Sequence, residues 1–537
     1  MRVAFLWHMH QPDYRVAGRF QRPWVYLHAL MGYTDMAAAL EAEPAARAVV
    51  NFTPVLLDQL DDYARRLKRW RDTGTPPRDP LLDALIRLPP PGPGRAELVR
   101  TCLPVTCNRR TDRDAAFGKI VDELCGADAA SIPDGLCVDL LVWHHLSWLG
   151  ETLRGGDPRA AELLRRGGDF TLADRRSLLE LIAEGVAAVI PRWRALAERG
   201  SVELSTTPYY HPLLPLLLDF SSACDTAPGS AVPGRPYPGG AQRARWHLQE
   251  GLARCEQLLG QRPTGCWPSE AALSEATLPL LAEAGFSWTA SSQSVLNASA
   301  GHAGKSGADP FRVYRRAGEA TACIFRDDGL SDRIGFAYKD WTAEDAVGDL
   351  IVHLENIARE PGRDLVLIAL DGENPWEYYP QNGLPFLREL YGQLSSHPSL
   401  KLATLGDCVV QLPAAPLPPV RAGSWVHGQL LTWIGHPEKN RAWELLIAAK
   451  EALDRSGRSD LVLLHRLGAC EGSDWFWWPG AHNPAPSVAD FDALFRAQLS
   501  SLYSELGIEP PPILARPFAH GVSHAVEAGG TMRPTEQ

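Results

Sequence analysis

Seven short, mainly apolar runs constrain the fold of this chain more than any other feature of its sequence. Because they lack the alternation of a half-buried strand, such runs are typical of parallel strands buried on both faces. They lie at residues 3–7, 49–52, 202–204, 265–267, 286–289, 322–325 and 365–370. Helical patterns accompany the later runs, at residues 243–259, 270–284, 343–359 and 383–394. Strands that alternate with helices predict an α/β architecture, here a barrel of seven strands.

Three stretches within the predicted barrel depart from this alternation. Residues 72–97 and 225–241 are rich in Pro and Gly, which predicts two irregular loops. Residues 102–199 carry a mainly helical pattern, so we expect a helical insertion there.

The C-terminal part differs in character from the barrel. A Pro-rich stretch at residues 413–419 predicts a linker, and helical patterns at 441–452 and 488–504 follow it. We therefore expect a barrel domain over residues 1–410 and an α-helical C-terminal domain over 411–528. Residues 529–537 are expected to form a disordered tail.

Charge and cysteine content exclude several classes of partner and location. The chain has 53 Lys and Arg against 64 Asp and Glu, a net charge of −11, which disfavours nucleic acid and anionic membranes. No apolar run approaches the roughly 20 residues of a membrane-spanning helix. The apolar start is too short for a secretion signal. The 10 cysteines include no C-x-x-C pair, which favours free thiols in a reducing compartment and hence a cytoplasmic protein.

Polar side chains follow five of the predicted strands directly. His8 and His10 follow the first, His211 the third, Glu270 the fourth, Arg326 the sixth and Asp371 the seventh. Alone, a carboxylate in this position is often only the N-cap of the next helix, and a histidine is often a core residue. Active sites of parallel α/β folds lie at the C-terminal ends of the strands, so this convergence predicts a catalytic site.

Two kinds of chemistry fit these residues. Glu270 and Asp371 could act as paired carboxylates, as a nucleophile and a general acid, in glycoside hydrolysis. Alternatively, His8, His10 and Asp371, with His211, could bind zinc and activate water, as in deacetylases. The residues alone leave both chemistries open, and sensitivity to a chelator separates them.

Aromatic, polar-rimmed segments characterise the C-terminal part. Trp425 lies in a Gly-Ser-Trp segment, Trp433 in Thr-Trp-Ile-Gly, and Asp474 in Ser-Asp-Trp-Phe-Trp-Trp. Tryptophan rings present flat apolar faces on which sugar rings stack, and an adjacent Asp can accept hydrogen bonds from hydroxyls. The alternative is that some of these tryptophans pack the helical domain onto the barrel.

Four segments, in order along the chain, resemble the motifs of family 57 glycoside hydrolases, which act on α-glucans. They are His-Met-His-Gln-Pro at residues 8–12, the segment 200–211, Trp-Pro-Ser-Glu at 267–270 and Leu-Asp-Gly-Glu-Asn at 370–374. The aromatic C-terminal segments resemble elements that close the sugar cleft in the amylopullulanase-like and branching-enzyme-like members. The resemblance covers nearly the whole chain and implies a (β/α)7 barrel with a helical insertion and an α-helical C-terminal domain.

The resemblance also implies roles for individual residues. Glu270 would be the nucleophile of a retaining mechanism and Asp371 the general acid/base. The implied substrate contacts are His10, His211, Trp267, Arg326, Asp332, Trp425, Trp433 and Asp474. The substrate would be an α-1,4-glucan polysaccharide or a maltooligosaccharide, with no metal and no cofactor.

The sequence departs from the family pattern at two places. Ala-Ala-Leu at residues 271–273 follows Glu270 where a smaller stretch is expected, and Pro-Gly-Ala-His at 479–482 replaces acidic residues. The second departure bears on acceptor specificity and on a bound cation. Neither removes a catalytic group. A non-catalytic α-glucan-binding relative remains the alternative from another functional class.

Overall fold

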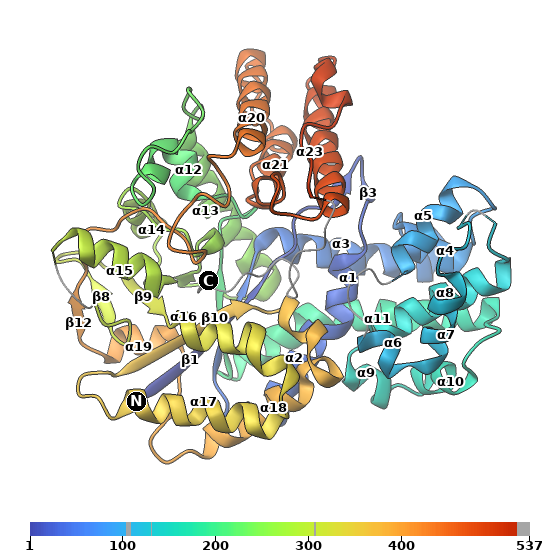
Figure 1. Ribbon diagram of the computed structural model, residues 1–537, viewed down its shortest axis with the longest axis horizontal. Coiled ribbons are helices and arrows are strands. Elements are labelled where there is room, and N and C mark those ends of the chain that lie inside the picture. Colours follow the sequence, from blue (N-terminus) through green and yellow to red (C-terminus); the bar gives the residue numbers. More distant parts are fainter. Residues whose placement is uncertain (104–108, 130, 305–307, 523–537) are drawn as a thin grey trace.

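A closed parallel barrel forms the centre of the molecule (Figure 1). The computed structural model describes residues 1–103, 109–129, 131–304 and 308–522. In this described part, seven parallel strands follow one another around the barrel in the order β10-β1-β4-β5-β6-β7-β9, and pairing of Leu367 with Arg326 closes the ring from β10 to β9. The strands are β1 (Arg2–Met9), β4 (Ala48–Phe52), β5 (Val202–Thr206), β6 (Gly265–Cys266), β7 (Trp288–Ser292), β9 (Ala322–Arg326) and β10 (Leu365–Asp371). The predicted barrel and its seven strands are confirmed.

Burial explains why the apolar runs form strands. Every residue of β1 after Arg2 is buried, and β4 and β9 are buried throughout. Helices cover the outside of the barrel, including α3 (Pro54–Thr73), α13 (Gly240–Leu259), α17 (Ala343–Ala358) and α18 (Leu384–Ser396). A strand enclosed in this way has no wet face, so it needs no alternation of polar and apolar residues.

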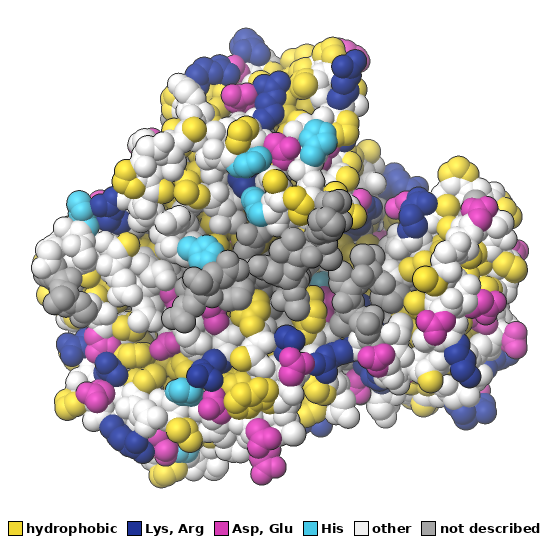
Figure 2. Space-filling view, in the orientation of Figure 1, with side chains coloured by type: hydrophobic (Ala, Val, Ile, Leu, Met, Phe, Trp, Pro, Cys, Tyr) yellow, Lys and Arg dark blue, Asp and Glu magenta, His cyan; other side chains and the backbone are white. Residues whose placement is uncertain are grey.

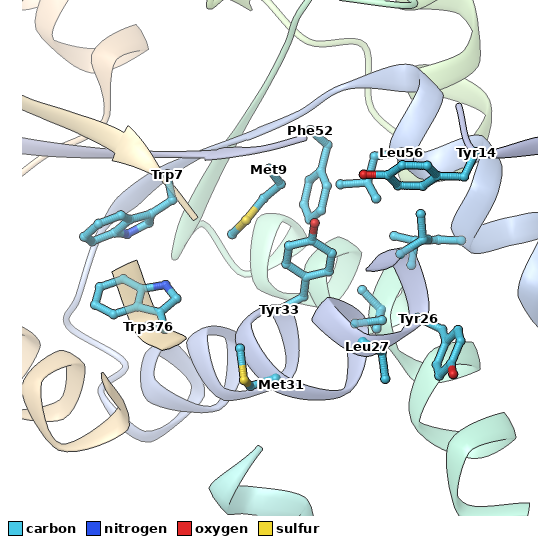
Figure 3. Packing of buried hydrophobic residues seen from close by; sticks show 14 of the residues in the cluster. Trp7, Met9, Tyr14, Tyr26, Leu27, Met31, Tyr33, Phe52, Leu56 and Trp376 are labelled. Carbon is cyan, nitrogen blue, oxygen red and sulfur yellow. The ribbon is translucent and has the colours of Figure 1, made fainter. Parts of the chain in front are cut away.

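One side of the barrel packs against three short consecutive helices. These are α1 (Trp24–His28), the π-helix η1 (Ala29–Tyr33) and α2 (Thr34–Ala42). Figure 3 shows Trp7 and Met9 of β1 facing Tyr33 and Trp376 across this layer, and the rings of Trp7 and Trp376 meet edge to face at 5.6 Å. These aromatic contacts fix the start of the chain against the segment that follows β10.

The predicted helical insertion is confirmed in its helical content. It comprises α6 (Arg109–Arg113), α7 (Ala115–Leu124), α8 (Asp134–Ser147), α9 (Glu151–Gly156), α10 (Pro158–Arg166) and α11 (Leu172–Glu198). A capping box starts α11, in which Thr171 and Asp174 satisfy each other's backbone N–H groups.

The prediction of an irregular loop over residues 72–97 is wrong. The segment contains α4 (Pro80–Ile86) and the start of α5 (Pro93–Cys102). Asp79 caps α4 by accepting from the N–H groups of Leu81 and Leu82, and proline stands at the first turn of both helices. Proline is well tolerated there because its missing N–H would be unpaired anyway. In contrast, the loop over 225–241 is confirmed up to the start of α13.

Two other sequence predictions need correction. The predicted linker at 413–419 contains β12 (Ala414–Pro416), which pairs with β8 (Val313–Arg315) and so extends the sheet beyond the barrel. Proline is accommodated there because β12 is an edge strand. The helix predicted from residue 270 begins later, as α14 (Thr277–Glu283), and Gly285 follows it with a φ of +90°.

Beyond residue 436 the chain forms a helical layer above the barrel (Figure 1). Its helices are α20 (Pro437–Ser456), α21 (Leu461–Cys470), α22 (Asp474–Trp477) and α23 (Ala485–Glu505). The buried Glu471 ties this layer to α13, because its carboxylate accepts hydrogen bonds from Arg243 Nε at 2.8 Å and His247 Nε2 at 2.7 Å, and from the Tyr237 hydroxyl. The division into domains at residue 410 stays a prediction, and the tail over 529–537 lies outside the described residues.

Charged side chains of both signs lie on the surface of the protein. On the face shown in Figure 2, basic and acidic side chains are interspersed. Among the described helices, none has the length and apolarity needed to cross a membrane.

Candidate active site

The C-terminal edge of the barrel brings together residues that lie far apart in the sequence. Asp371 ends β10 and pairs in register with His8 near the end of β1. His211 follows β5, and Glu270 follows β6 in the short 3₁₀ turn η3 (Ser269–Ala271). Because parallel strands end on the same side of a barrel, their side chains meet there.

Glu270 is held by two donors from the C-terminal part of the chain. Trp425 Nε1 donates to Glu270 Oε2 at 3.0 Å, and Ser473 Oγ donates to Glu270 Oε1 at 2.8 Å. The backbone N–H of Trp425 also donates to the carbonyl oxygen of Glu270 at 3.1 Å. Glu270 has a φ of +59°, in the left-handed region that is uncommon for residues with a Cβ. Such outliers concentrate at functional sites, where the surroundings hold them in place.

Three histidines form a layered cluster beside Glu270. The rings of His10 and His211 stack with centroids 3.9 Å apart and planes at 22°, and His8 Nε2 lies 3.2 Å from His211 Nε2. His10 Nε2 contacts Asp474 at 3.0 Å. Burial, with His10 nearby, lowers the pKa of His8 to about 3, and burial lowers that of His211 well below its ordinary value. The two buried imidazoles are therefore neutral.

Both candidate catalytic carboxyl groups are buried, and burial disfavours their charged forms. It raises the pKa of Glu270 to about 8 and that of Asp371 to about 6. The two groups also repel each other when both are charged. Hydrogen bonds act in the opposite direction: Glu270 accepts from Ser473 and Trp425, whereas Asp371 accepts from Asn374 at 3.0 Å.

Arg326 and Trp267 surround the indole of Trp425. The guanidinium of Arg326 lies 5.2 Å from the ring of Trp425, and the buried ring of Trp267 meets it edge to face at 5.4 Å. Arg326 is held in turn by Ala369 O, by Asp328 and, at 3.6 Å, by Asp332. Asp332 is thus placed beside Arg326, and two residues, Arg326 and Trp425, separate it from Glu270.

The family assignment follows from a match over most of the chain. A model of glycosyl hydrolase family 57 matches residues 4–420. This chain belongs to glycosyl hydrolase family 57. The comparison with curated proteins gives no match.

Three solved structures of similar fold are those of a branching enzyme, an α-amylase and a 4-α-glucanotransferase. A family 57 branching enzyme from Thermococcus kodakaraensis, solved with glucose, has a TM-score of 0.59 at 16% identity and covers 94% of this chain and 90% of its own. An α-amylase from Thermotoga maritima has a TM-score of 0.55 at 13% identity, and the match covers 94% of this chain and 93% of the amylase. A 4-α-glucanotransferase from Thermococcus litoralis has a TM-score of 0.53 at 13% identity. The match covers 94% of this chain and 60% of the glucanotransferase. At these identities the likeness shows the fold.

Trp433 of this family 57 protein is buried, whereas the sequence predicts its segment to be a loop that lines a wet cleft. Its side chain is fully buried, its ring packs 5.6 Å from that of Trp477, and its carbonyl oxygen accepts from Trp443 Nε1. The physical reason is that α20, which carries Trp443, covers this segment. Trp433 is a core residue of the helical layer, which is the alternative weighed for these tryptophans.

Several residues of the site were not predicted as members of it. Glu373 is buried and accepts from the backbone N–H of His10 at 2.7 Å and from the Tyr33 hydroxyl. Ser473 bridges Glu270 and His211, and Asn51 contacts His8. Glu373 stands two positions after Asp371, and Ser473 directly precedes Asp474. Their proximity in sequence to predicted site residues was the signal that could have identified them. Asn51 lies inside an apolar strand and carried no such signal beyond being polar there.

One group of described residues offers possible metal ligands. Donor atoms of His10, His211 and Asp474 lie within 4.8 Å of one another. However, the stacked rings of His10 and His211 direct their nitrogen lone pairs along nearly parallel planes, which do not converge on one ion. We assign no metal to this group.

Proposed function

We propose that this family 57 protein cleaves α-1,4-linked glucans with retention of anomeric configuration. The observation that carries the proposal is the carboxyl pair at the C-terminal edge of the barrel. Glu270 is fixed by two donors, and Asp371 interacts with it through its charge. The proteins of similar structure include a branching enzyme, an α-amylase and a 4-α-glucanotransferase, which supports an α-glucan substrate.

In the first step, a Glu270 oxygen forms a bond to the anomeric carbon while the glycosidic C–O bond breaks. The proton of Asp371 moves to the departing oxygen, which leaves a glycosyl-enzyme ester and an Asp371 carboxylate. In the second step, that carboxylate takes a proton from water or from a sugar hydroxyl, whose oxygen attacks the anomeric carbon. Glu270 is released and Asp371 is protonated again.

These roles require the proton that the pair holds near neutral pH to lie on Asp371. Burial alone leaves it on Glu270, since burial raises the pKa of Glu270 further. The donors act against this: Glu270 accepts two hydrogen bonds from side chains outside the barrel, and each favours its ionised form. With both donors in place, Glu270 is the ionised member of the pair in this proposal, because each donor stabilises the carboxylate more than the neutral acid.

We assign the remaining contacts by their position. His10, His211 and Asp474 would bind hydroxyl groups of the sugar at the cleavage point, and Trp425 would form one wall. Arg326, Asp332 and Trp267 would hold Trp425 in place. In this proposal residues 1–410 form the catalytic domain and 411–528 complete its cleft. The protein would act in the cytoplasm, in keeping with its cysteine usage.

Incubation with amylose and with maltoheptaose tests the proposal. We expect shorter maltooligosaccharides, released first as the α-anomer by ¹H NMR, with longer or branched products in addition if a sugar hydroxyl competes with water. The Glu270→Gln variant serves as the inactive control. Failure to convert either substrate, or release of the β-anomer, would overturn the proposal.

A further inference from the structure

A chain of hydrogen bonds runs from the barrel core to Glu270. Asn51 on β4 contacts His8 Nδ1 at 2.7 Å, and His8 Nε2 contacts His211 Nε2 at 3.2 Å. His211 Nδ1 contacts Ser473 Oγ at 2.8 Å, and Ser473 Oγ donates to Glu270 Oε1 at 2.8 Å. Asn51, His8, His211 and Ser473 are each at most 2% exposed, so water does not replace these partners.

A chain of this kind has a direction. A neutral imidazole has one N–H and one bare nitrogen, and a hydroxyl has one hydrogen, so each group that accepts from one neighbour donates to the next. If Asn51 donates to His8, then His8 donates to His211, His211 to Ser473, and Ser473 to an ionised Glu270. If Asn51 accepts from His8, every bond reverses, and Glu270 needs a proton to donate to Ser473.

The neighbours of Asn51 decide between the two directions. The oxygen and nitrogen of an amide are assigned from their partners. The amide atom that faces His8 Nδ1 also lies 2.8 Å from Thr207 Oγ1, and Thr207 Oγ1 lies 2.9 Å from the carbonyl oxygen of Trp267. That carbonyl can only accept, so it takes the single hydroxyl hydrogen of Thr207. The Thr207 oxygen is then an acceptor. The structure places Oδ1 of Asn51 beside it, so these partners require the amide to be turned over, with the nitrogen toward Thr207 and His8.

Ser205 supports the same orientation from the other side of the amide. Its Oγ lies 3.2 Å from the second amide atom of Asn51. With the oxygen of Asn51 toward Ser205, the buried Ser205 hydroxyl donates to it. With the nitrogen there, that hydroxyl hydrogen has no acceptor among the hydrogen bonds of the described residues, which is costly in a dry core.

We propose that Thr207 and Asn51, neither of which reaches the substrate, set the direction of this chain and thereby hold Glu270 as a carboxylate, ready to attack. The inference rests on the proposed function and adds two positioning residues to it. Trp425 Nε1 donates to the other oxygen of Glu270, so each oxygen accepts a hydrogen bond and the ionised form is favoured.

Other charged and titratable groups face the same cluster. Asp371 and Asp474 face Glu270 from β10 and α22, and His10 faces both His8 and His211. Arg326 lies on the far side of Trp425. The carboxylates favour protonation of Glu270, so the directed chain and the indole are the groups that oppose it.

The histidine tautomers give a test that needs no turnover. In protein labelled with ¹⁵N-histidine, two-bond ¹H–¹⁵N couplings distinguish Nδ1–H from Nε2–H, and His8→Gln and His211→Gln variants assign the two signals. We expect His8 to carry its hydrogen on Nε2 and His211 on Nδ1 at pH 7. The reverse pair of tautomers, or an imidazolium on either residue, would overturn the inference.

A matched pair of variants tests the functional consequence. Thr207→Val removes the acceptor that orients Asn51. Thr289→Val makes the same change at a buried threonine of the barrel whose hydroxyl has no hydrogen-bond partner among the described residues. A reversed chain makes Glu270 harder to ionise, so Thr207→Val should move the acidic limb of kcat/KM to higher pH by about one unit, with roughly tenfold lower activity on that limb. Thr289→Val should leave the limb in place.

The outcomes separate the two proposals. Expected tautomers in a protein that converts no α-glucan would overturn the proposed function and keep the inference. An active enzyme in which the Thr207→Val limb does not move, or moves equally in Thr289→Val, would overturn the inference alone. A purely structural role of Thr207 predicts lower stability with an unchanged pH profile.

Discussion

Trp425 and Trp433 come from neighbouring loop-like segments of similar composition and have opposite surroundings. Trp425 donates to the carboxylate of Glu270, whereas Trp433 is enclosed by the helical layer. The difference lies in what each segment packs against. Leu273 and Gly423 form a two-way backbone bridge that ties the Trp425 segment to the turn of Glu270. A Cβ at Gly423 would lie 2.3 Å from the carbonyl oxygen of Gly428, so only glycine permits this approach.

The contrast indicates that the backbone contacts of an aromatic segment, and not its residue types, decide whether its tryptophan reaches the site. Here those contacts are the two hydrogen bonds between Leu273 and Gly423, which serve as the tether of the Trp425 segment. Trp425 is hydrogen-bonded to the backbone of Glu270, so its side chain is held beside that carboxylate. Trp433 has no such tether among the described contacts. Activity and stability should therefore respond to changes at the two groups of residues in opposite ways.

The largest expected effect falls on the partner of Trp425. Glu270→Gln should lower kcat roughly 10⁴-fold, about 5 kcal/mol, because an amide cannot form the glycosyl-enzyme. The thermal midpoint should be retained. Azide should restore turnover in Glu270→Gly and give the opposite anomer. A variant with more than a few per cent of the activity would refute the role of Glu270.

Trp433→Ala should affect stability instead. Removing a fully buried indole leaves a cavity and should cost about 3–5 kcal/mol of the free energy of unfolding, measured by denaturant titration. Folded molecules should keep their kcat at a temperature well below the transition. A loss of kcat in fully folded Trp433→Ala would erase the contrast with Trp425.

Asp474→Ala should lower activity and leave stability nearly unchanged. It removes the partner of His10 Nε2, and the side chains of both residues are partly exposed. We expect at least tenfold lower kcat/KM on long α-glucans, about 1.4 kcal/mol, with a small change in thermal midpoint. A large destabilisation that accounts for the lost activity would instead assign Asp474 to interdomain packing.

The pH dependence should report the carboxyl pair as a unit. Below about pH 6 both groups are protonated and no nucleophile exists, and above about pH 8 both are ionised and no acid remains. The profile of kcat/KM should therefore be bell-shaped with a maximum near pH 7, whichever group holds the shared proton. A rate that rises continuously to pH 9 would contradict it.

The smallest expected effect is that of a chelator. Two carboxyl groups suffice for the proposed chemistry, so prolonged dialysis against EDTA should leave the rate unchanged. Activity that disappears and returns with Zn²⁺ would restore the metal-dependent reading of His8, His10 and Asp371.

Sequence reasoning located the barrel and its C-terminal edge because fully buried strands leave an unmistakable apolar pattern. Glu270, Asp371, His10 and His211 follow from that pattern, since each lies at the end of a strand or within a few residues after it. Trp425 and Trp433 could not be separated, because their surroundings depend on contacts remote in sequence. Asn51 and Thr207 were missed for the same reason: their importance lies in partners contributed by other strands.

The proline-rich stretches show a different limit. Proline at residues 80 and 93 marks the first turn of a helix, and in β12 it lies on an edge strand. In each case the residue suits a position where its missing N–H is harmless. Composition alone indicates a break in structure, whereas the capping residue beside it, such as Asp79, indicates where the next element begins.

Both donors on Glu270 come from residues beyond position 420, where the match to the family model ends. Glu270 thus belongs to one stretch of the chain and the donors on its carboxylate to another. This arrangement restricts evolutionary exchange: a barrel of this kind can acquire a new C-terminal part only if that part again offers an N–H and a hydroxyl at the same two oxygens. Within that restriction, the rest of the layer is free to diverge and to reshape the entrance for other glucans.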